Sequence, residues 1–583
     1  MASLQTSLIW VLYTIAVAVA VLVAWFLVHI YQTPRDRSRA VTLTCIFTIT
    51  SLLATVLLLP VDVALVSSAT SSNLGQRKGW ATQNDVDNFL PSLTVVYYLL
   101  YSLDAILCLL VIPFVYFWYE EYDEVATEAG EQSSGQRLWA ALKYTMSFVA
   151  IVAVLLLVGC LIPMSNVENA TENEPLAASM VKNRGERAFL FTIGALMTIG
   201  VPFYALYTST GLALLPLQAI KVSSASKDTW KAAMIVQLES NRERQRQLDR
   251  RCGGNSGLLS SKDRRELDTL VREERTLIRR QRLADEAHAE HRDWVVKLWL
   301  KAEATCRPLR VLGGVGLFLI AFLILISMFA TSIDKVSNSL CKHRCGYLLK
   351  HMHTFNPVDW ILIQSARIFP VDYIIFTVLT LLLFFSSVFG IATIGIRLLW
   401  VNVYQIRRGH TSPQALLLTT VILMLTILTL NYSLSMNVAS QYTLFGSQTF
   451  CDRPPSPEGR PDCSDNTQLM KRCSDIADNA AAKQSCTPSV ASTFVNHVAT
   501  KFPFFGVILF WSQFMFIGFY LLVVVTFIVR SPRQDERSLN EEAEEAEETE
   551  EENLLASTGR RDNAGLDDII RRMDRQNDSR SVG

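Results

Sequence analysis

The sequence predicts an all-α membrane protein: a polytopic bundle of about nine transmembrane helices with a cytosolic helical hairpin. Half of the 583 residues are hydrophobic, and they occur in blocks of 20 or more. A block of that length crosses a hydrocarbon core of ~30 Å as a helix, the form that pairs its own backbone groups in lipid. Two blocks, Val371–Ile396 and Leu416–Met436, flank a short basic turn. This pattern predicts a transmembrane hairpin with its turn in the cytosol.

The first membrane half, residues 1–216, holds five predicted spans. Leu8–Tyr31 has no basic residue before it and is longer than the apolar core of a signal peptide, so we expect it to be retained as an anchor. Three arginines between residues 35 and 39 follow it, which favours a luminal N-terminus. The other spans are predicted at about Ala40–Val66, Leu93–Trp118, Lys143–Met164 and Ala188–Leu214.

The long hydrophilic stretch of residues 217–310 predicts a cytosolic helical hairpin. It is rich in charged residues, nearly free of proline, and divided by the glycine-rich segment Cys252–Gly257. The second membrane half, residues 311–529, adds spans at Val311–Ile333 and Phe502–Val529 on either side of the transmembrane hairpin.

The C-terminal tail, residues 530–583, carries the glutamate run Glu541–Glu552. Such a run has too little apolar surface to fold, so we expect a disordered acidic tail. After nine predicted spans this tail lies in the cytosol.

The candidate luminal loops carry six of the eleven cysteines. An even number of cysteines in an oxidising compartment predicts disulfides. The distribution of basic residues agrees less well with this topology, because the loop after the sixth predicted span would hold Lys335 and other basic residues on the luminal side. The candidate disulfide cysteines are Cys341, Cys345, Cys451, Cys463, Cys473 and Cys486.

Three sequons bear on the same topology. Asn169-Ala170-Thr171 lies in a predicted luminal loop and is the candidate N-glycosylation site. The sequon at Asn431 is too close to a span, and the one at Asn577 lies in the predicted cytosolic tail, so we interpret both as chance matches.

Acidic residues inside the spans are the candidate polar sites. Asp104 lies near the middle of the third predicted span, where an ionised carboxylate costs roughly 3 kcal/mol or more. It therefore either contacts a proton or substrate in a polar path or bonds to a neighbouring helix. Asp62, which with Pro60 interrupts the second span, and Asp372 lie nearer the ends, where we expect solvated carboxylates.

Cys341, Cys345, His351 and His353 are close enough in sequence to suggest a metal site. Their spacing matches no standard zinc pattern, so disulfides and surface histidines are the preferred interpretation, and no metal is predicted. We also expect histidines of these loops, including His497, to become charged in an acidic lumen.

Glu550, Leu554 and Leu555 in the acidic tail have the form of an acidic dileucine sorting signal. Two leucines on a flexible peptide can enter a pocket while the acid meets a basic patch, which predicts binding to a clathrin adaptor. The alternative is a solvated acidic tail.

The sequence contains no P-loop, no Gly-x-Ser-x-Gly elbow and no His-Glu-x-x-His, so we predict no enzyme activity. The formal net charge is zero, so no global field favours nucleic acid. Membrane lipids are the expected surroundings.

Two stretches resemble the limb-region-1-like membrane protein family, in its lysosomal cobalamin-transporter branch. The first holds the motifs Gly395–Arg408, Pro413–Leu417, Leu430–Tyr432 and Gln441–Gln448, and the second is Gly211–Leu217, Gly-Leu-Ala-Leu-Leu-Pro-Leu. The resemblance covers most of residues 1–530, because the number of spans and the long loop after the fifth also agree.

This resemblance implies a multi-pass protein of the lysosomal or vacuolar membrane that exports cobalamin from the lumen, with cobalamin as cargo or bound ligand and no catalytic cofactor. It also implies an ABC-type partner, with the chain acting as transporter or escort. Two alternatives stay open: an endocytic or signalling receptor of the lipocalin-receptor type, and a scaffold that binds partners through residues 217–310.

Overall fold

The computed structural model describes residues 2–33, 38–71, 75–78, 83–121, 134–161, 184–224 and 307–339 without a gap, and parts of 236–278, 346–453 and 463–529. Within these ranges, nine helices are long and apolar enough to cross a membrane. The predicted all-α membrane bundle is therefore confirmed.

The first five spans are built from the following elements. They are α1 (Ala2–Tyr31), α2 (Arg39–Ser68), α3 with η1 and α4 (Gln83–Ile106, Leu107–Val111 and Ile112–Glu120), α6 (Ser134–Leu161), and α8 with η2 and α9 (Arg184–Phe203, Tyr204–Thr208 and Ser209–Ser224). The segments η1 and η2 are π-helical turns inside spans three and five.

The last four spans are separated by short helices and strands. The spans are α13 (Arg307–Asn338), α15 (Val371–Ile394), α16 with the π-helical turn η5 (Pro413–Ser433 and Leu434–Val438), and Pro503–Val529. The short helices are α14 (Pro357–Ser365), α17 (Ser440–Phe445) and α19 (Val490–Lys501). The antiparallel strand pairs are β1–β2 (Thr70–Ser71 and Gln76–Arg77), β3–β4 (Ile396–Leu398 and Val401–Tyr404) and β5–β6 (Thr449–Cys451 and Met470–Arg472).

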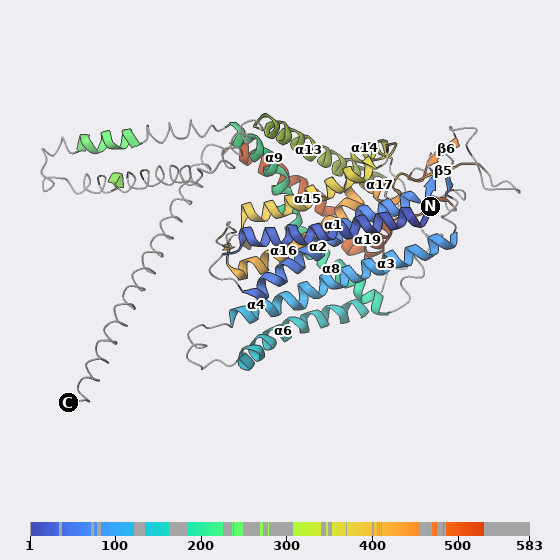
Figure 1. The fold of residues 1–583 in the computed structure, drawn as a ribbon, viewed down its shortest axis with the longest axis horizontal. Coiled ribbons are helices and arrows are strands. Elements are labelled where there is room, and N and C mark those ends of the chain that lie inside the picture. Colours follow the sequence, from blue (N-terminus) through green and yellow to red (C-terminus); the bar gives the residue numbers. More distant parts are fainter. Residues whose placement is uncertain are drawn as a thin grey trace, which may run out of the picture. The chain divides into compact units, whose positions relative to one another are not determined.

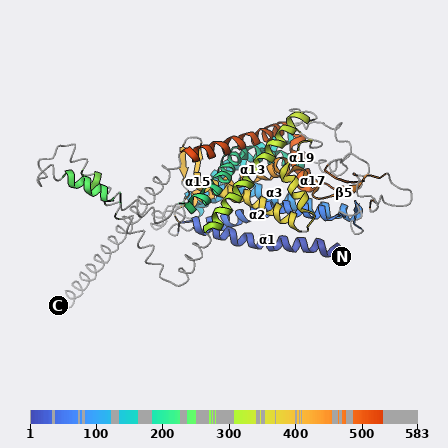
Figure 2. The ribbon, with the colours of Figure 1, turned by 90° about the horizontal axis from the view of Figure 1, so that it is seen from above.

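The chain divides into two units. Residues Met1–Leu217 and Val315–Val523 form one, which we call the membrane unit, and residues Gln218–Gly314 and Val524–Gly583 form the other. In the membrane unit the spans run side by side (Figures 1 and 2). Helices α2 and α16 are its most buried spans and contact each other, whereas α6 is the most exposed.

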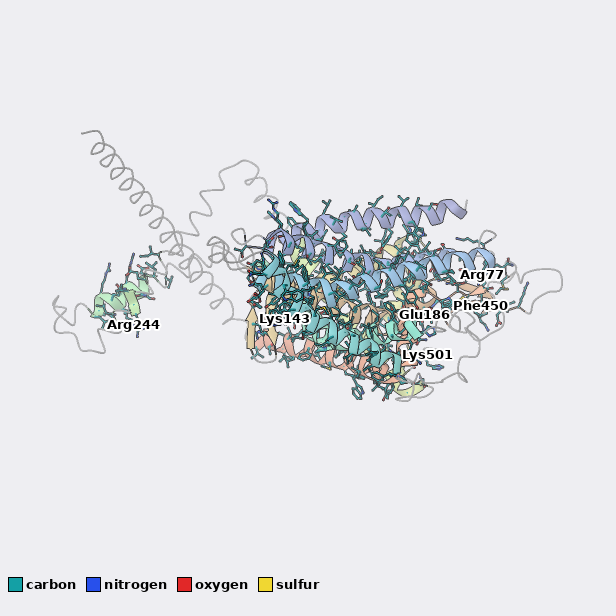
Figure 3. The ribbon with its side chains drawn as sticks, turned by 90° about the horizontal axis from the view of Figure 1, so that it is seen from below. Arg77, Lys143, Glu186, Arg244, Phe450 and Lys501 are labelled. Carbon is teal, nitrogen blue, oxygen red and sulfur yellow. A yellow bond between two sulfur atoms is a disulfide. The ribbon has the colours of Figure 1, made fainter. Side chains whose placement is uncertain are left out.

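The two ends of the membrane unit differ. One end, which we call the disulfide end, carries β5, β6 and the bonds Cys451–Cys463 and Cys473–Cys486. Figure 3 shows Arg77, Phe450, Glu186 and Lys501 at this end and Lys143 at the opposite end. Figure 1 shows α14 and α17 near β5 and β6. The sequence did not predict β3–β4 between spans seven and eight.

Two predictions about span boundaries are wrong. Helix α2 continues through Pro60 and Asp62 without interruption. Helix α13 extends to Asn338, so Lys335 belongs to a span and is buried, although it was predicted in a loop. Because this lysine is not a loop charge, the charge pattern conflicts less with the predicted topology than the sequence suggested.

Spans five and seven approach through two glycines. A Cβ built on Gly211 would lie 1.7 Å from the carbonyl oxygen of Ser386, and one on Gly390 would lie 1.9 Å from that of Tyr207. Only glycine permits this backbone contact, which helix pairs in membranes often use. Beside the glycines, the hydroxyls of Thr208 and Ser387 form a 2.9 Å hydrogen bond between the two spans.

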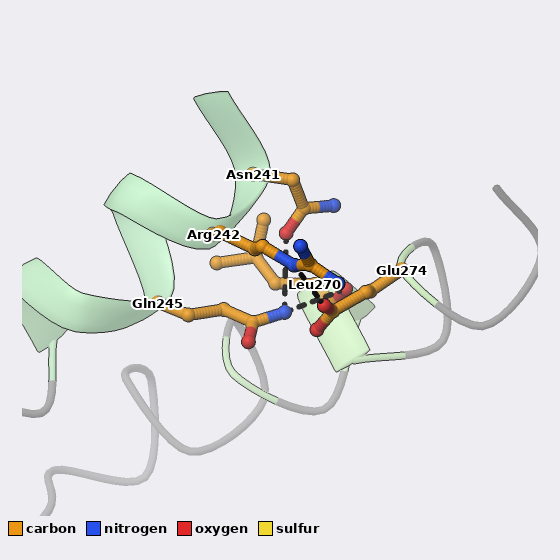
Figure 4. Close-up of polar contacts among 5 residues, drawn as sticks. All are labelled: Asn241, Arg242, Gln245, Leu270 and Glu274. Carbon is orange, nitrogen blue, oxygen red and sulfur yellow. Dashed lines mark hydrogen bonds and ion pairs between the residues drawn. The ribbon is translucent and has the colours of Figure 1, made fainter. Parts of the chain in front are cut away.

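The second unit contains two described helical segments that lie side by side. Arg242 Nε donates to Glu274 Oε1 at 2.7 Å, and Gln245 Nε2 donates to the carbonyl of Leu270 at 3.2 Å (Figure 4). The residue numbers rise along one segment as they fall along the other, which is an antiparallel arrangement. It agrees with the predicted hairpin, whose glycine-rich turn lies outside the described residues.

We predict that Gly211→Ala destabilises the membrane unit by about 1–3 kcal/mol, because the new methyl group forces spans five and seven apart. Thermal unfolding of the purified full-length protein in detergent measures the effect. Gly316→Ala in α13 is the matched control, since a Cβ at Gly316 meets no atom within 4 Å. Equal melting temperatures for both variants would contradict the proposed contact.

Candidate functional site

Asp104 is buried between spans two and three, and α2 supplies both of its donors. Ser51 Oγ donates to one carboxylate oxygen at 2.6 Å, and Thr55 Oγ1 donates to the other at 2.8 Å. Ser51 and Thr55 are four residues apart, so they lie on the same face of α2. The arrangement favours the interpretation in which Asp104 joins two helices.

Asp62 caps a helix from another part of the chain. Its carboxylate accepts hydrogen bonds from the backbone N–H groups of Val490 at 3.3 Å and Ala491 at 2.7 Å, at the start of α19. A negative charge is favourable there, since the first N–H groups of a helix have no partner inside it. The expected solvated carboxylate is wrong, because Asp62 is 0% exposed.

A second carboxylate cap occurs at α17. Asp359 of α14 accepts from the N–H groups of Gln441 at 3.3 Å and Tyr442 at 2.9 Å. The Tyr442 hydroxyl donates to Asp372 at 2.9 Å. Asp372 is also buried, so its predicted solvated position is wrong. The carboxylates bond α17 to α14 and to the start of α15.

Burial shifts two titratable groups outside the spans in opposite directions. It raises the pKa of Asp359 to about 7, although the hydrogen bonds from Tyr442 and Gln441 oppose this shift. It lowers the pKa of His497 in α19 to about 4, and the positive charge of Lys501 adds to the effect. We expected His497 to become charged in an acidic lumen. That expectation is wrong, because a pKa of about 4 keeps the imidazole neutral at pH 5.

Four spans share a buried polar contact zone, which we call the interior seam. The Tyr204 hydroxyl of η2 donates to Ser433 Oγ of α16 at 2.7 Å, and its ring stacks on Phe516 of the last span with centroids 5.0 Å apart. Ser433 and Asn437 are four residues apart on the eighth span. Lys335 Nζ of α13 donates to Asn437 Oδ1 at 2.7 Å. These contacts connect spans five, six, eight and nine.

Asn356, immediately before α14, holds η5 beside α13. Its Oδ1 accepts from Ser327 Oγ at 2.7 Å, and its Nδ2 donates to the Val438 carbonyl at 3.1 Å. Val438 follows Asn437 in the chain. The Asn356 side chain therefore fixes the backbone that presents Asn437 to Lys335.

The interior seam contains polar atoms that no protein group satisfies. Within the described part of the chain, Gln513 Oε1 and Nε2, the Tyr520 hydroxyl and Asn437 Nδ2 are buried and have no hydrogen-bond partner. Gln513 and Tyr520 flank Phe516 at positions i−3 and i+4, so the three lie on one helix face. A buried polar group without a partner costs free energy, which makes these positions on the helices of the interior seam the candidate functional site.

Sequence reasoning did not single out the interior seam. Gln513 and Asn437 were overlooked, and Lys335 was assigned to a loop. The available signal was the one that identified Asp104, a polar residue close to or within an apolar run. Hydropathy gives no indication, however, of which helix face points inward.

The other predicted site residues have these positions. Cys451 is bonded to Cys463 and Cys473 to Cys486, whereas Cys341 and Cys345 lie outside the described residues. Asn169, Glu550, Leu554 and Leu555 also lie outside them. Asn431 is buried within α16, which agrees with the interpretation of its sequon as a chance match.

The structure offers no metal-binding group of three or more His, Cys, Asp or Glu side chains among the residues it describes. Of the four residues considered for such a site, only His353 is among them. Its backbone N–H donates to Asp334 at 2.9 Å.

We predict that Asp359→Asn changes how stability depends on pH. Because folding raises the pKa of Asp359 from 3.8 to about 7, the folded state binds this proton more tightly. The resulting stabilisation is complete below pH 3.8 and is lost as the pH rises through 7. From pH 5 to pH 8 the free energy of unfolding of the wild type should therefore fall by on the order of 2 kcal/mol relative to that of the variant.

Thermal unfolding of both proteins across this pH range measures that difference. His497→Gln is the opposing control. Because the pKa of His497 is lowered, the wild type loses stability as the pH falls from 6.5 toward 4, so this variant should be more stable than the wild type in acid. Parallel profiles for the wild type and Asp359→Asn would contradict the shift.

Comparison with known proteins identifies the family. Residues 8–306 match the family model of the LMBR1-like membrane proteins. The chain is 62% identical over 581 residues to the "Probable lysosomal cobalamin transporter" of Aspergillus terreus, covering 99% of this chain and 100% of the relative. Proteins of the same name from Aspergillus oryzae and Ajellomyces capsulatus are 59% and 54% identical, with 100% and 99% of this chain and 100% and 98% of the relatives covered. No solved structure matches this chain. The chain therefore belongs to the LMBR1-like membrane protein family.

Proposed function

We propose that this protein is required to export cobalamin from the lysosomal or vacuolar lumen to the cytosol. The observation that carries the proposal is full-length similarity to relatives named as probable lysosomal cobalamin transporters, at up to 62% identity. A transport role also suits a bundle whose interior seam combines amide, hydroxyl and ammonium groups. The names of the relatives support transport rather than the receptor or scaffold alternatives.

We propose that the disulfide end of the membrane unit faces the lumen. Disulfides form in oxidising compartments, and two are present at this end. This orientation gives a luminal N-terminus and a cytosolic C-terminus. It also places the buried contact between Asp359 and α17 toward the acidic side, where the raised pKa of Asp359 favours its neutral form.

We propose that the chain acts with an ABC-type transporter, as a transporter itself or as an escort. The sequence has no P-loop, so ATP-driven export needs a partner that binds nucleotide. The acidic tail, residues 530–583, contains a candidate adaptor-binding segment at Glu550, Leu554 and Leu555.

We predict that loss of this protein traps cobalamin in the organelle. Purified lysosomes or vacuoles loaded with radiolabelled cobalamin should retain most of the label without the protein and release it when the wild type is restored. Labelled amino acid efflux serves as the control for membrane integrity. Unchanged cobalamin release would refute the proposal. Liposomes holding the purified chain with and without the ABC-type partner separate transporter from escort.

We predict that Leu554→Ala together with Leu555→Ala moves the protein to the cell surface, because the two leucines are the part of the signal that enters an adaptor pocket. Surface biotinylation measures the redistribution. Leu566→Ala, a leucine substitution elsewhere in the same tail, is the control. If the double variant stayed in the organelle, the tail would not act as this signal.

A further inference from the structure

The last span carries an amide that the protein does not use. Gln513 is 0% exposed, and neither its Oε1 nor its Nε2 has a partner among the described residues. It is ten residues beyond Pro503, which corresponds to about 15 Å along the helix. An amide buried at this depth has no free access to bulk water, so its unmet hydrogen bonds are costly.

The unfilled groups lie on helices that contact one another. Gln513 and Tyr520 are on the face of the last span that presents Phe516 to Tyr204. Tyr204 bonds to Ser433, and one turn further along the eighth span Asn437 accepts from Lys335. The seam therefore offers two amides, one phenol and one ammonium group.

Lys335 differs from the other buried charges in the bundle. Among the residues that the structure describes, its one hydrogen bond is to the neutral Oδ1 of Asn437, and it forms no ion pair there. Buried charges in proteins are usually paired or coordinated. By contrast, Asp104, Asp62 and Asp359 each accept two hydrogen bonds from the protein. The protein therefore provides partners for the carboxylates, whereas polar groups of the seam remain without hydrogen-bond partners in the described ranges.

We propose that the interior seam is the intramembrane contact for the cargo, with Gln513, Tyr520 and Asn437 binding primary carboxamides and Lys335 binding a phosphodiester. This inference rests on the proposed function and names the ligand groups that the site recognises. Amides pair with amides because each offers both a donor and an acceptor. An ammonium group makes a stronger, charge-assisted hydrogen bond to a phosphate oxygen. Cobalamin carries carboxamides around its corrin ring and a single phosphodiester in its nucleotide loop.

Equilibrium binding to the purified full-length protein in detergent tests the inference. The probes are cyanocobalamin and dicyanocobinamide, a corrinoid that has the carboxamides but lacks the nucleotide loop. Gln513→Leu should weaken both probes about fivefold, the value of one neutral hydrogen bond. Lys335→Met should weaken the binding of cyanocobalamin about tenfold or more and leave the binding of dicyanocobinamide unchanged. Lys335→Arg should restore the binding of cyanocobalamin.

Two controls separate binding from folding. Ser512→Ala changes the neighbouring residue, whose hydroxyl already bonds to the Leu509 carbonyl at 2.6 Å, and should bind both probes like the wild type. The melting temperature of Gln513→Leu should equal or exceed that of the wild type, because the substitution removes a buried amide that lacks partners. Lys335→Met leaves Asn437 Oδ1 without its donor, so for this variant the selective loss of cyanocobalamin binding, and not the melting temperature, separates binding from folding. A structural role predicts lower melting temperatures and equal losses for both probes, which would overturn the inference.

The remaining outcomes distinguish the two proposals. Wild-type affinity in both variants overturns the seam as the site but leaves cobalamin export intact. If the wild type binds neither probe while its loss still traps cobalamin in the organelle, the cargo contact is overturned and the escort function stands. If loss of the protein does not trap cobalamin, the proposed function fails and the cargo assignment fails with it.

Discussion

The membrane unit depends on hydrogen bonds that join each buried carboxylate to a second element. Asp104 of α3 binds hydroxyls of α2, Asp62 of α2 binds the start of α19, and Asp359 of α14 binds the start of α17. A carboxylate in hydrocarbon is stable only with such partners. Dispersion forces alone bring apolar helices together without a strong preference for one register. The carboxylates supply that preference, because their donors are at fixed positions.

The interior seam differs from these carboxylates, because its polar groups are incompletely hydrogen-bonded. Its amides and its lysine have fewer partners than their chemistry allows. The segments η2 and η5, which present Tyr204 and Asn437, are π-helical, a conformation that often marks functional sites in helices. Asn356 holds η5 in place from outside the seam. The bundle therefore combines carboxylates that are bonded to a second element with a polar interior whose bonding is incomplete.

The sequence was sufficient to predict the spans, because runs such as those in α15 and α16 are long, apolar and bounded by a basic turn. It could not predict the environment of Asp62, since burial there depends on α19, a twelve-residue helix that is too short to be recognised as a span. Lys335 was misplaced for a related reason: hydropathy falls near Ile333, but the helix continues to Asn338 and other elements bury Lys335 there. Gln513 is recognisably polar in the sequence, yet only packing shows that its amide faces other helices.

The cap on α19 has a consequence for biogenesis. The bond partners of Asp62 lie 428 and 429 positions later in the chain. During synthesis the second helix therefore enters the bilayer long before its acid can be neutralised by α19. Until residues 490 and 491 have been made, the nascent protein carries a membrane-region carboxylate that lacks these two donors. The bundle can therefore close around Asp62 only after α19 has been synthesised.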